Sequence, residues 1–313
     1  MNASLAEKVH EGLSLNSIGG LALPVDNAVS CRDFYENALG LKPIGSDVLP
    51  GLGAHILLCA PSGQWIALCE ADGPALSEMG VHYGFRCSPT GRQAIADRLQ
   101  ASGVDTHDYR EDRPAERDDN FYFHDPSGNR LQLVVGPDDP QAAGVSAIDH
   151  RILMVFDMLW AERFYVHGLG LPVEHRVGWM TADHAMARKW AAGEQDMAPG
   201  TRRLDKLYMT MGGQNEVPRA NMQIFMETGS SILGLYLATQ HFQEPPEGTL
   251  TGPPRTAFFT VEPALDNAAA LLESLGTPFE GPIAHSPTSP LASSLYFKDP
   301  SSNFLEICTV RTV

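Results

Sequence analysis

Two stretches of sequence, each present twice, decide the fold. Phe34–Leu41 reads FYENALGL, and FYVHGLGL follows 130 residues later at Phe164–Leu171. Phe121–Gln132 reads FYFHDPSGNRLQ, and LYFKDPSSNFLE follows 174 residues later at Leu295–Glu306. A chain that repeats itself in this way is built from copies of one supersecondary unit. The copies can therefore be compared position by position to see which of them have kept chemically useful side chains.

The composition restricts the class of protein. At 313 residues the chain fits two domains of about 150 residues each. A net charge of −16, with no basic cluster beyond Arg202-Arg203, argues against binding to nucleic acid or to an anionic membrane. No apolar run approaches the roughly 20 residues needed to span a bilayer, and Met1–Asn16 lacks the apolar core of a signal peptide. We therefore expect a cytoplasmic protein with reduced, mostly buried cysteines.

The repeats predict four modules, each with a strand, a helix and three further strands. The strands that open the modules are expected at 21–25, 81–87, 148–155 and 256–261. The helices are expected at 30–39, 92–101, 158–168 and 264–275. The Asp125-Pro126-Ser127-Gly128 turn predicts a hairpin that closes the second module, and Asp299-Pro300 does the same in the fourth. The fold class is therefore α+β.

The modules divide into two halves. Gly136–Pro140 is the natural linker, so we expect one domain at 15–137 and a second at 146–313. The two repeat offsets differ by 44 residues, which places an insert around 176–252 in the third module. A structural extension is the default interpretation of this insert, and a substrate lid is the alternative.

Four such modules, each with the Phe-Tyr-x-x-x-Leu-Gly-Leu helix or its equivalent, resemble the vicinal oxygen chelate superfamily. This superfamily includes glyoxalase I, bleomycin resistance proteins and the type I extradiol dioxygenases, and the tandem arrangement is most similar to the last of these. The extradiol signature is matched by His285, Leu295-Tyr296, Asp299-Pro300 and Glu306, with a longer spacer and with Ser302 in place of glycine. The resemblance implies that each pair of modules forms an open cup-like mixed sheet.

The resemblance also implies where a metal binds. In this superfamily the ligands come from the first strand of each module and from the last strand of at least one. In the C-terminal half these positions hold His150 and Glu306, and the third holds Thr256, next to Arg255. Imidazole and carboxylate suit a divalent ion. We therefore expect His150 and Glu306 to hold Fe(II), with Mn or Zn as alternatives.

The same positions in the N-terminal half hold Gly20, Ala67, His82 and Gln132. One imidazole and one amide bind a dication poorly, so this half is expected to be a scaffold without a metal site. His82 is interpreted as a hydrogen-bonded strand histidine.

Other roles follow from the resemblance alone. Tyr296 is expected to orient a substrate or ligand oxygen, and His285 to act as an acid or base. Thr256 or Arg255 is expected to contact substrate. Core packing is the alternative interpretation of Tyr296, and a solvated loop position that of His285.

Three functions remain open. The first is a metal-dependent dioxygenase that cleaves the ring of a catechol-like, vicinal-oxygen aromatic substrate. The second is a lyase or isomerase that works through a metal-bound enolate, because the fold does not decide between these reactions. The third is a resistance-type protein that binds a small molecule without catalysis. Homodimers are common for such folds, so a homo-oligomer is also open.

Overall fold

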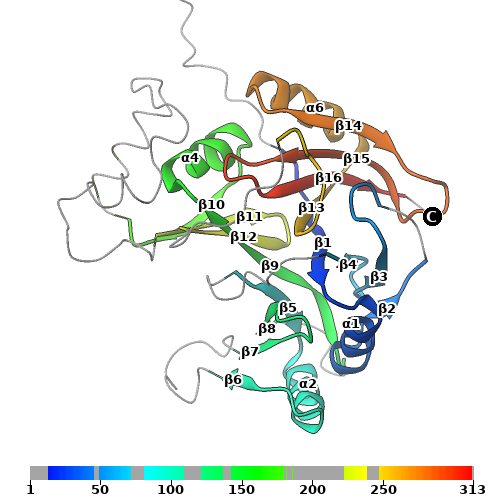
Figure 1. Cartoon of the computed structure of the whole chain (residues 1–313). Coiled ribbons are helices and arrows are strands. Elements are labelled where there is room, and N and C mark those ends of the chain that lie inside the picture. The colour runs from blue at the N-terminus through cyan, green and yellow to red at the C-terminus, as the bar shows by residue number, and fades with distance from the viewer. Residues whose placement is uncertain are drawn as a thin grey trace, which may run out of the picture.

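The computed structural model describes residues 13–45, 49–71, 81–108, 121–136, 142–179, 181, 185, 222–237 and 247–311. These residues form two eight-stranded sheets with a few helices (Figure 1). Most of the insert around 176–252 and most of the linker lie outside the described residues, and so does any lid that the insert forms. None of the described helices has both the length and the apolar character needed to cross a bilayer.

The first two modules have the expected order of elements. The first consists of β1 (Ser17–Val25), α1 (Ala28–Phe34), the π-helical turn η2 (Tyr35–Leu39), β2 (Lys42–Pro43), β3 (His55–Cys59) and β4 (Trp65–Glu70). The second consists of β5 (Tyr83–Cys87), α2 (Pro89–Ala101), β6 (Thr106–Asp108), β7 (Phe121–His124) and β8 (Arg130–Val135). The Asn27 side chain caps α1 by accepting from the backbone of Ser30, and Gly40 ends the helix at a φ of 80°.

The other two modules repeat this order. The third consists of β9 (Val145–Val155), α4 (Met158–Glu162), η4 (Arg163–Gly168), β10 (Val173–Val177), β11 (Gln223–Thr228) and β12 (Ser231–Leu237). The fourth consists of β13 (Arg255–Thr260), α6 (Glu262–Ser274), β14 (Phe279–Ala284), β15 (Leu291–Lys298) and β16 (Phe304–Val310). The predicted α+β fold of four strand–helix–three-strand modules is therefore confirmed.

The pairing of the modules differs from the expectation. Sheet A has the strand order β14-β15-β16-β13-β1-β4-β3-β2 and combines the fourth module with the first. Sheet B has the order β10-β11-β12-β9-β5-β8-β7-β6 and combines the third module with the second. The opening strands join them, because β1 pairs antiparallel with β13, and β5 pairs antiparallel with β9. Each sheet thus takes one module from each half of the chain, whereas pairing within each half was expected.

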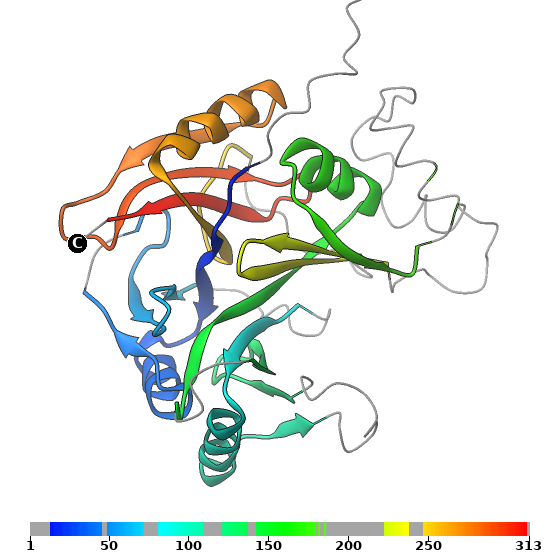
Figure 2. The ribbon, with the colours of Figure 1, turned by 180° about the vertical axis from the view of Figure 1, so that it is seen from behind.

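Within each half, the two modules are instead joined by their repeated motifs. The Tyr35 hydroxyl of the first module donates to Asp125 Oδ2 of the second at 3.1 Å, and Tyr165 donates to Asp299 Oδ2 at 2.9 Å. The helices follow the same pairing. Figures 1 and 2 show α1 beside α2 at one end of the molecule, and α4 near α6 at the other.

The side chain of Asp299 accepts several hydrogen bonds within its turn. Asp299 Oδ1 accepts from the backbone amides of Ser301 and Asn303 at 2.9 and 2.8 Å, and Oδ2 accepts from the Asn303 amide group at 2.9 Å. Burial nevertheless raises the Asp299 pKa to about 6, although these bonds and the Tyr165 hydroxyl oppose the shift. Ser302 takes a φ of 68°, in the left-handed region that its counterpart Gly128 occupies at 83°.

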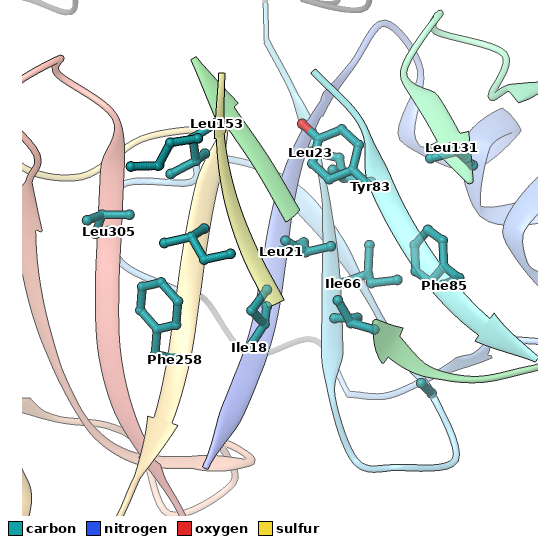
Figure 3. Close-up of a cluster of buried hydrophobic side chains, with 14 of the residues drawn as sticks. Ile18, Leu21, Leu23, Ile66, Tyr83, Phe85, Leu131, Leu153, Phe258 and Leu305 are labelled. Atoms are coloured by element: carbon teal, nitrogen blue, oxygen red, sulfur yellow. The ribbon is translucent and has the colours of Figure 1, made fainter. Parts of the chain in front are cut away.

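The main hydrophobic core lies between the two sheets. Figure 3 shows Ile18 and Leu21 of sheet A in one buried cluster with Phe85 and Leu153 of sheet B. Apolar residues of the helices, such as Tyr35, belong to the same core. Each sheet therefore has a core-facing side and a side turned away from the core, which we call its outer face.

The tyrosine–aspartate contact leads to a stability prediction. Tyr165→Phe removes a donor from a buried carboxylate and should lower the free energy of unfolding by about 1–3 kcal/mol. Ionised Asp299 is disfavoured in the folded state because its pKa lies above the unfolded value, and losing Tyr165 raises that pKa further. The loss should therefore be larger at about pH 8 than at about pH 5, on either side of this pKa. Urea unfolding at both pH values measures it.

Tyr83→Phe is the matched control for this measurement. It also removes a buried hydroxyl, but Tyr83 makes no hydrogen bond to a carboxylate in the described part of the chain. Equal effects of the two variants at both pH values would contradict the proposed role of Tyr165.

Candidate functional site

Strand register brings four side chains together on the outer face of sheet B. Gly84 of β5 lies opposite His150 of β9 on one side and opposite Gln132 of β8 on the other. His82 precedes Gly84 by two residues, so its side chain points to the same face. The His82 and His150 rings lie 5.1 Å apart between centroids at 86°. Two imidazoles and an amide group, carried by neighbouring strands, thus lie side by side on this face.

The glycine between these groups is required for their arrangement. A Cβ at Gly84 would overlap the His150 ring, so this imidazole can lie across β5 only because the position has no side chain. His150 Nε2 then reaches Gln132 Oε1 at 3.1 Å. His82 and Gln132 are buried, and His150 is half-buried.

The orientation of His150 is held by an ion pair. Its Nδ1 lies 2.9 Å from Asp149 Oδ1, and Arg86 donates to Asp149 Oδ2 from Nε and Nη2 at 3.0 and 2.9 Å. Burial tends to raise the Asp149 pKa, but the bonds from His150 and Arg86 outweigh burial and lower it. The carboxylate therefore stays ionised and fixes the proton of His150 on Nδ1. In this tautomer Nε2 is an acceptor, so its hydrogen bond with Gln132 requires the amide group to be turned so that the NH2 donates.

Aromatic side chains surround this group. The Tyr122 ring stands at 5.4 Å from the His82 ring and the Tyr236 ring at 6.2 Å, both edge-on. The centroids of the Phe225 and Tyr236 rings are 6.0 Å apart. These three aromatic residues are only partly buried, so the outer face of sheet B has buried polar groups at its base and accessible aromatic walls.

The outer face of sheet A holds a buried ion pair at the equivalent place. Ala257 of β13 lies opposite Gly20 of β1 and opposite Glu306 of β16, as Gly84 does with its two neighbours. Arg255, two residues before Ala257, corresponds to His82. Its Nε lies 2.9 Å from Glu306 Oε2, and neither side chain is exposed to solvent.

Both oxygens of this carboxylate are engaged. Ser294 Oγ donates to Glu306 Oε1 at 2.6 Å, and His285 Nε2 lies 2.7 Å from Ser294 Oγ. The guanidinium also donates from Nη1 to the backbone oxygen of Pro50 at 2.8 Å. The buried cation that Glu306 needs is therefore supplied by the chain itself.

Tryptophan and apolar residues fill the rest of this face. A Cβ at Gly20 would overlap the Trp65 indole, which thus covers the strand position that corresponds to His150 in sheet B. Trp65 packs in a second apolar cluster with Ala22, Leu57, Ala67 and neighbouring residues. With one engaged carboxylate and no imidazole at these strand positions, the outer face of sheet A does not fit a divalent metal.

The predicted metal ligands are not brought together. His150 lies on sheet B with Gln132 and Asp149, and Glu306 lies on sheet A with Arg255 and Ser294. The expectation that they share an ion is corrected because their strands belong to different sheets. Among the described residues, no group of three or more His, Cys, Asp and Glu could hold a metal. In sheet B the third donor is an amide.

The remaining predicted residues belong to sheet A. Thr256 lies opposite Leu21 and Leu305, is buried and faces the main core, and its expected contact with substrate stays a prediction. Arg255 is on the outer face, but the ion pair buries it. Tyr296 lies beneath the guanidinium, which stands 4.9 Å from the centre of its ring.

His285 reaches the buried carboxylate only through Ser294. The Tyr296 hydroxyl has a pKa raised by burial, followed in effect by the charge of Glu306. His285 and Tyr296 therefore surround the Arg255–Glu306 pair, and their expected catalytic roles stay untested.

The group in sheet B was missed because each half was interpreted separately. His82 and His150 were both identified as first-strand positions, and Gln132 as a last-strand position. Nothing local showed that the second and third modules share a sheet. Only the second and third modules have histidine at the ligand position of the opening strand. This pattern could have indicated that the two modules share a sheet.

Comparison with known proteins agrees with this architecture. Residues 17–133 match the model of the Glyoxalase/Bleomycin resistance protein/Dioxygenase superfamily, and the third and fourth modules repeat the unit that the matched region contains. The matched region, residues 17–133, therefore belongs to this superfamily. Members of the superfamily bind divalent metals. A search of curated proteins finds no match.

Solved structures show the same fold. A putative dioxygenase from Bacillus subtilis is 14% identical, with a TM-score of 0.61 over 96% of this chain and 87% of its own. Glyoxalase I from Zea mays is 12% identical, with a TM-score of 0.53 over 94% of this chain and 92% of its own.

The ion pair of sheet A gives a second prediction. Arg255→Met leaves Glu306 buried without a counter-charge and should lower the free energy of unfolding by about 3–5 kcal/mol. The double variant Arg255→Met/Glu306→Leu removes both charges and should recover most of this loss. Urea unfolding of the wild type, both single variants and the double variant measures the coupling. Losses that simply add would contradict the ion pair.

Proposed function

We propose that the outer face of sheet B is the functional site of this protein. His82, His150 and Gln132 would hold a divalent metal there, and a small aromatic substrate with two adjacent oxygens would bind above it. The observation that supports this most is the convergence of two imidazoles and an amide oxygen on one partly accessible place. The rival face of sheet A is closed by its own guanidinium.

The donor chemistry fits a metal. Two ligand atoms in neighbouring positions at about 2.1 Å from one ion lie about 3 Å apart, and His150 Nε2 and Gln132 Oε1 are separated by 3.1 Å. Asp149 behind His150 is the type of partner that fixes a metal-binding imidazole. All three donors are neutral, so a bound ion would keep its full charge.

Ring cleavage by a dioxygenase is the first reaction to test. Fe(II) is the metal we propose, because two histidines and one further oxygen donor resemble the ligand set of non-haem oxygenases. When bound, the metal supplies Lewis acidity and a template for adjacent oxygens. Tyr236 would orient the substrate as a proton donor, because burial raises the pKa of its hydroxyl. The likeness to a putative dioxygenase supports this choice at the level of fold.

A binding protein without catalysis is the second candidate. It is favoured by one observation, the absence of a carboxylate among the three donors. His150 Nε2 and the Gln132 amide can also satisfy each other through a shared proton, without any metal. A lyase or isomerase would use the metal but not dioxygen.

Metal content separates the metalloenzymes from the binding protein. Anaerobically purified protein is loaded with Fe(II), Mn(II) or Zn(II), and the bound ion is measured by elemental analysis after dialysis. We expect the wild type to hold about one ion, and His82→Ala and His150→Ala to bind it at least ten-fold more weakly. Glu306→Gln and the control His167→Ala, which removes a partly exposed helix histidine, should leave metal binding unchanged.

Equal metal content in the wild type and in both sheet B histidine variants would contradict the proposed site. If the metal is confirmed, oxygen uptake with a panel of catechols then tests the reaction. Uptake that depends on His82 and His150 supports ring cleavage. Its absence in the metal-loaded protein would contradict the dioxygenase and leave the lyase or isomerase.

A further inference from the structure

Arg130 lies on the outer face of sheet B and, within the described part of the chain, has no carboxylate partner. Arg130 lies on β8 two residues before Gln132, so both side chains point to the same face. Its guanidinium stands 4.2 Å from the centre of the Tyr122 ring. Among the described residues no carboxylate forms an ion pair with it. Because acidic residues outnumber basic ones in this chain, with a net charge of −16, an arginine without an acidic partner is unexpected.

Arg130 interacts with two of the aromatic side chains on this face, Tyr122 and Tyr236. It covers Tyr122, and its positive charge opposes the rise that burial causes in the Tyr236 pKa. Tyr122 and Tyr236 stand on either side of His82. The guanidinium therefore lies at the same end of the face as the two phenol rings.

The other charged groups of this face are already used or lie elsewhere. Asp149 is paired with Arg86 and His150. Glu227 lies opposite Ile232, near the hairpin end of β11 and β12, whereas Tyr236 lies near the other end of β12. An anionic ligand beside Arg130 would thus meet no unpaired carboxylate among the described residues at that end.

The spacing along β8 suits a ligand of defined length. Residues two apart on a strand have Cα atoms about 7 Å apart, close to the length of a benzene ring with its substituents, and the long Arg130 side chain can adjust to such a ligand. A ring whose two oxygens approach His150 and Gln132 would therefore carry its opposite end to Arg130. Tyr122, Tyr236 and Phe225 would contact the faces and edges of this ring.

We propose that Arg130 selects substrates that carry an anionic group, so that the ligand class is an aromatic acid with two adjacent ring oxygens. This inference rests on the proposed function, because it assumes that the oxygens bind at His82, His150 and Gln132. The carboxylate of the ligand would accept from the guanidinium, which is only partly exposed. A neutral catechol would lack this contact.

The test is calorimetric titration without oxygen, which measures binding and not turnover. Protein loaded with Zn(II) is titrated with protocatechuate (a catechol with a carboxylate), with its neutral methyl ester and with catechol itself. The variants are Arg130→Gln, Arg130→Lys and the control Arg32→Gln, which removes an equal charge from an exposed position on α1.

We expect the wild type to bind protocatechuate more tightly than the ester. Arg130→Gln should weaken protocatechuate binding about ten-fold to one hundred-fold and leave the ester and catechol unchanged. Arg130→Lys should keep part of the preference, and Arg32→Gln all of it. Equal affinities of the wild type for acid and ester, or a preference that survives Arg130→Gln, would overturn the inference and spare the proposed function. If the wild type binds none of the three ligands, both the inference and the proposed function are overturned.

Discussion

The structure depends on the hydrogen bond between a helix tyrosine and a turn aspartate, which occurs once in each half of the chain. Tyr35 with Asp125, and Tyr165 with Asp299, join consecutive modules through their helices and turns. The opening strands are then left to pair with the other half, as β1 does with β13 and β5 with β9. Each outer face is consequently assembled from both halves, and the second and third modules contribute to the same one.

This pairing of strands between the halves explains why the two outer faces carry different polar side chains. They use equivalent strand positions, yet one has His82 and Gln132 where the other has Arg255 and Glu306. A buried carboxylate requires a cation, and an arginine of the same chain provides it on sheet A. On sheet B the corresponding donors are neutral, so a cation from outside can be accommodated. Where sheet B has His150, sheet A has Gly20, and the Trp65 indole covers it.

The sequence predicted what is local and periodic. The four modules, their helices, the glycine that ends the first helix and the aspartate turns follow from repeats and capping residues, and the structure contains them. Pairing between distant strands could not be predicted, because two equivalent modules can be joined in more than one way. The face on which each residue of β13 lies was also beyond the reach of the sequence. A shift of one residue along β13 moves a side chain to the other face, so Arg255 and not Thr256 lies beside Glu306.

Crystals of the protein loaded with Mn(II), measured by anomalous diffraction at two wavelengths around the manganese edge, test the central claim most directly. If the outer face of sheet B is the functional site, the anomalous peak lies between His82, His150 and Gln132, and the Arg255–Glu306 pair stays intact. A peak beside Glu306, or no peak within reach of the two histidines, would contradict it.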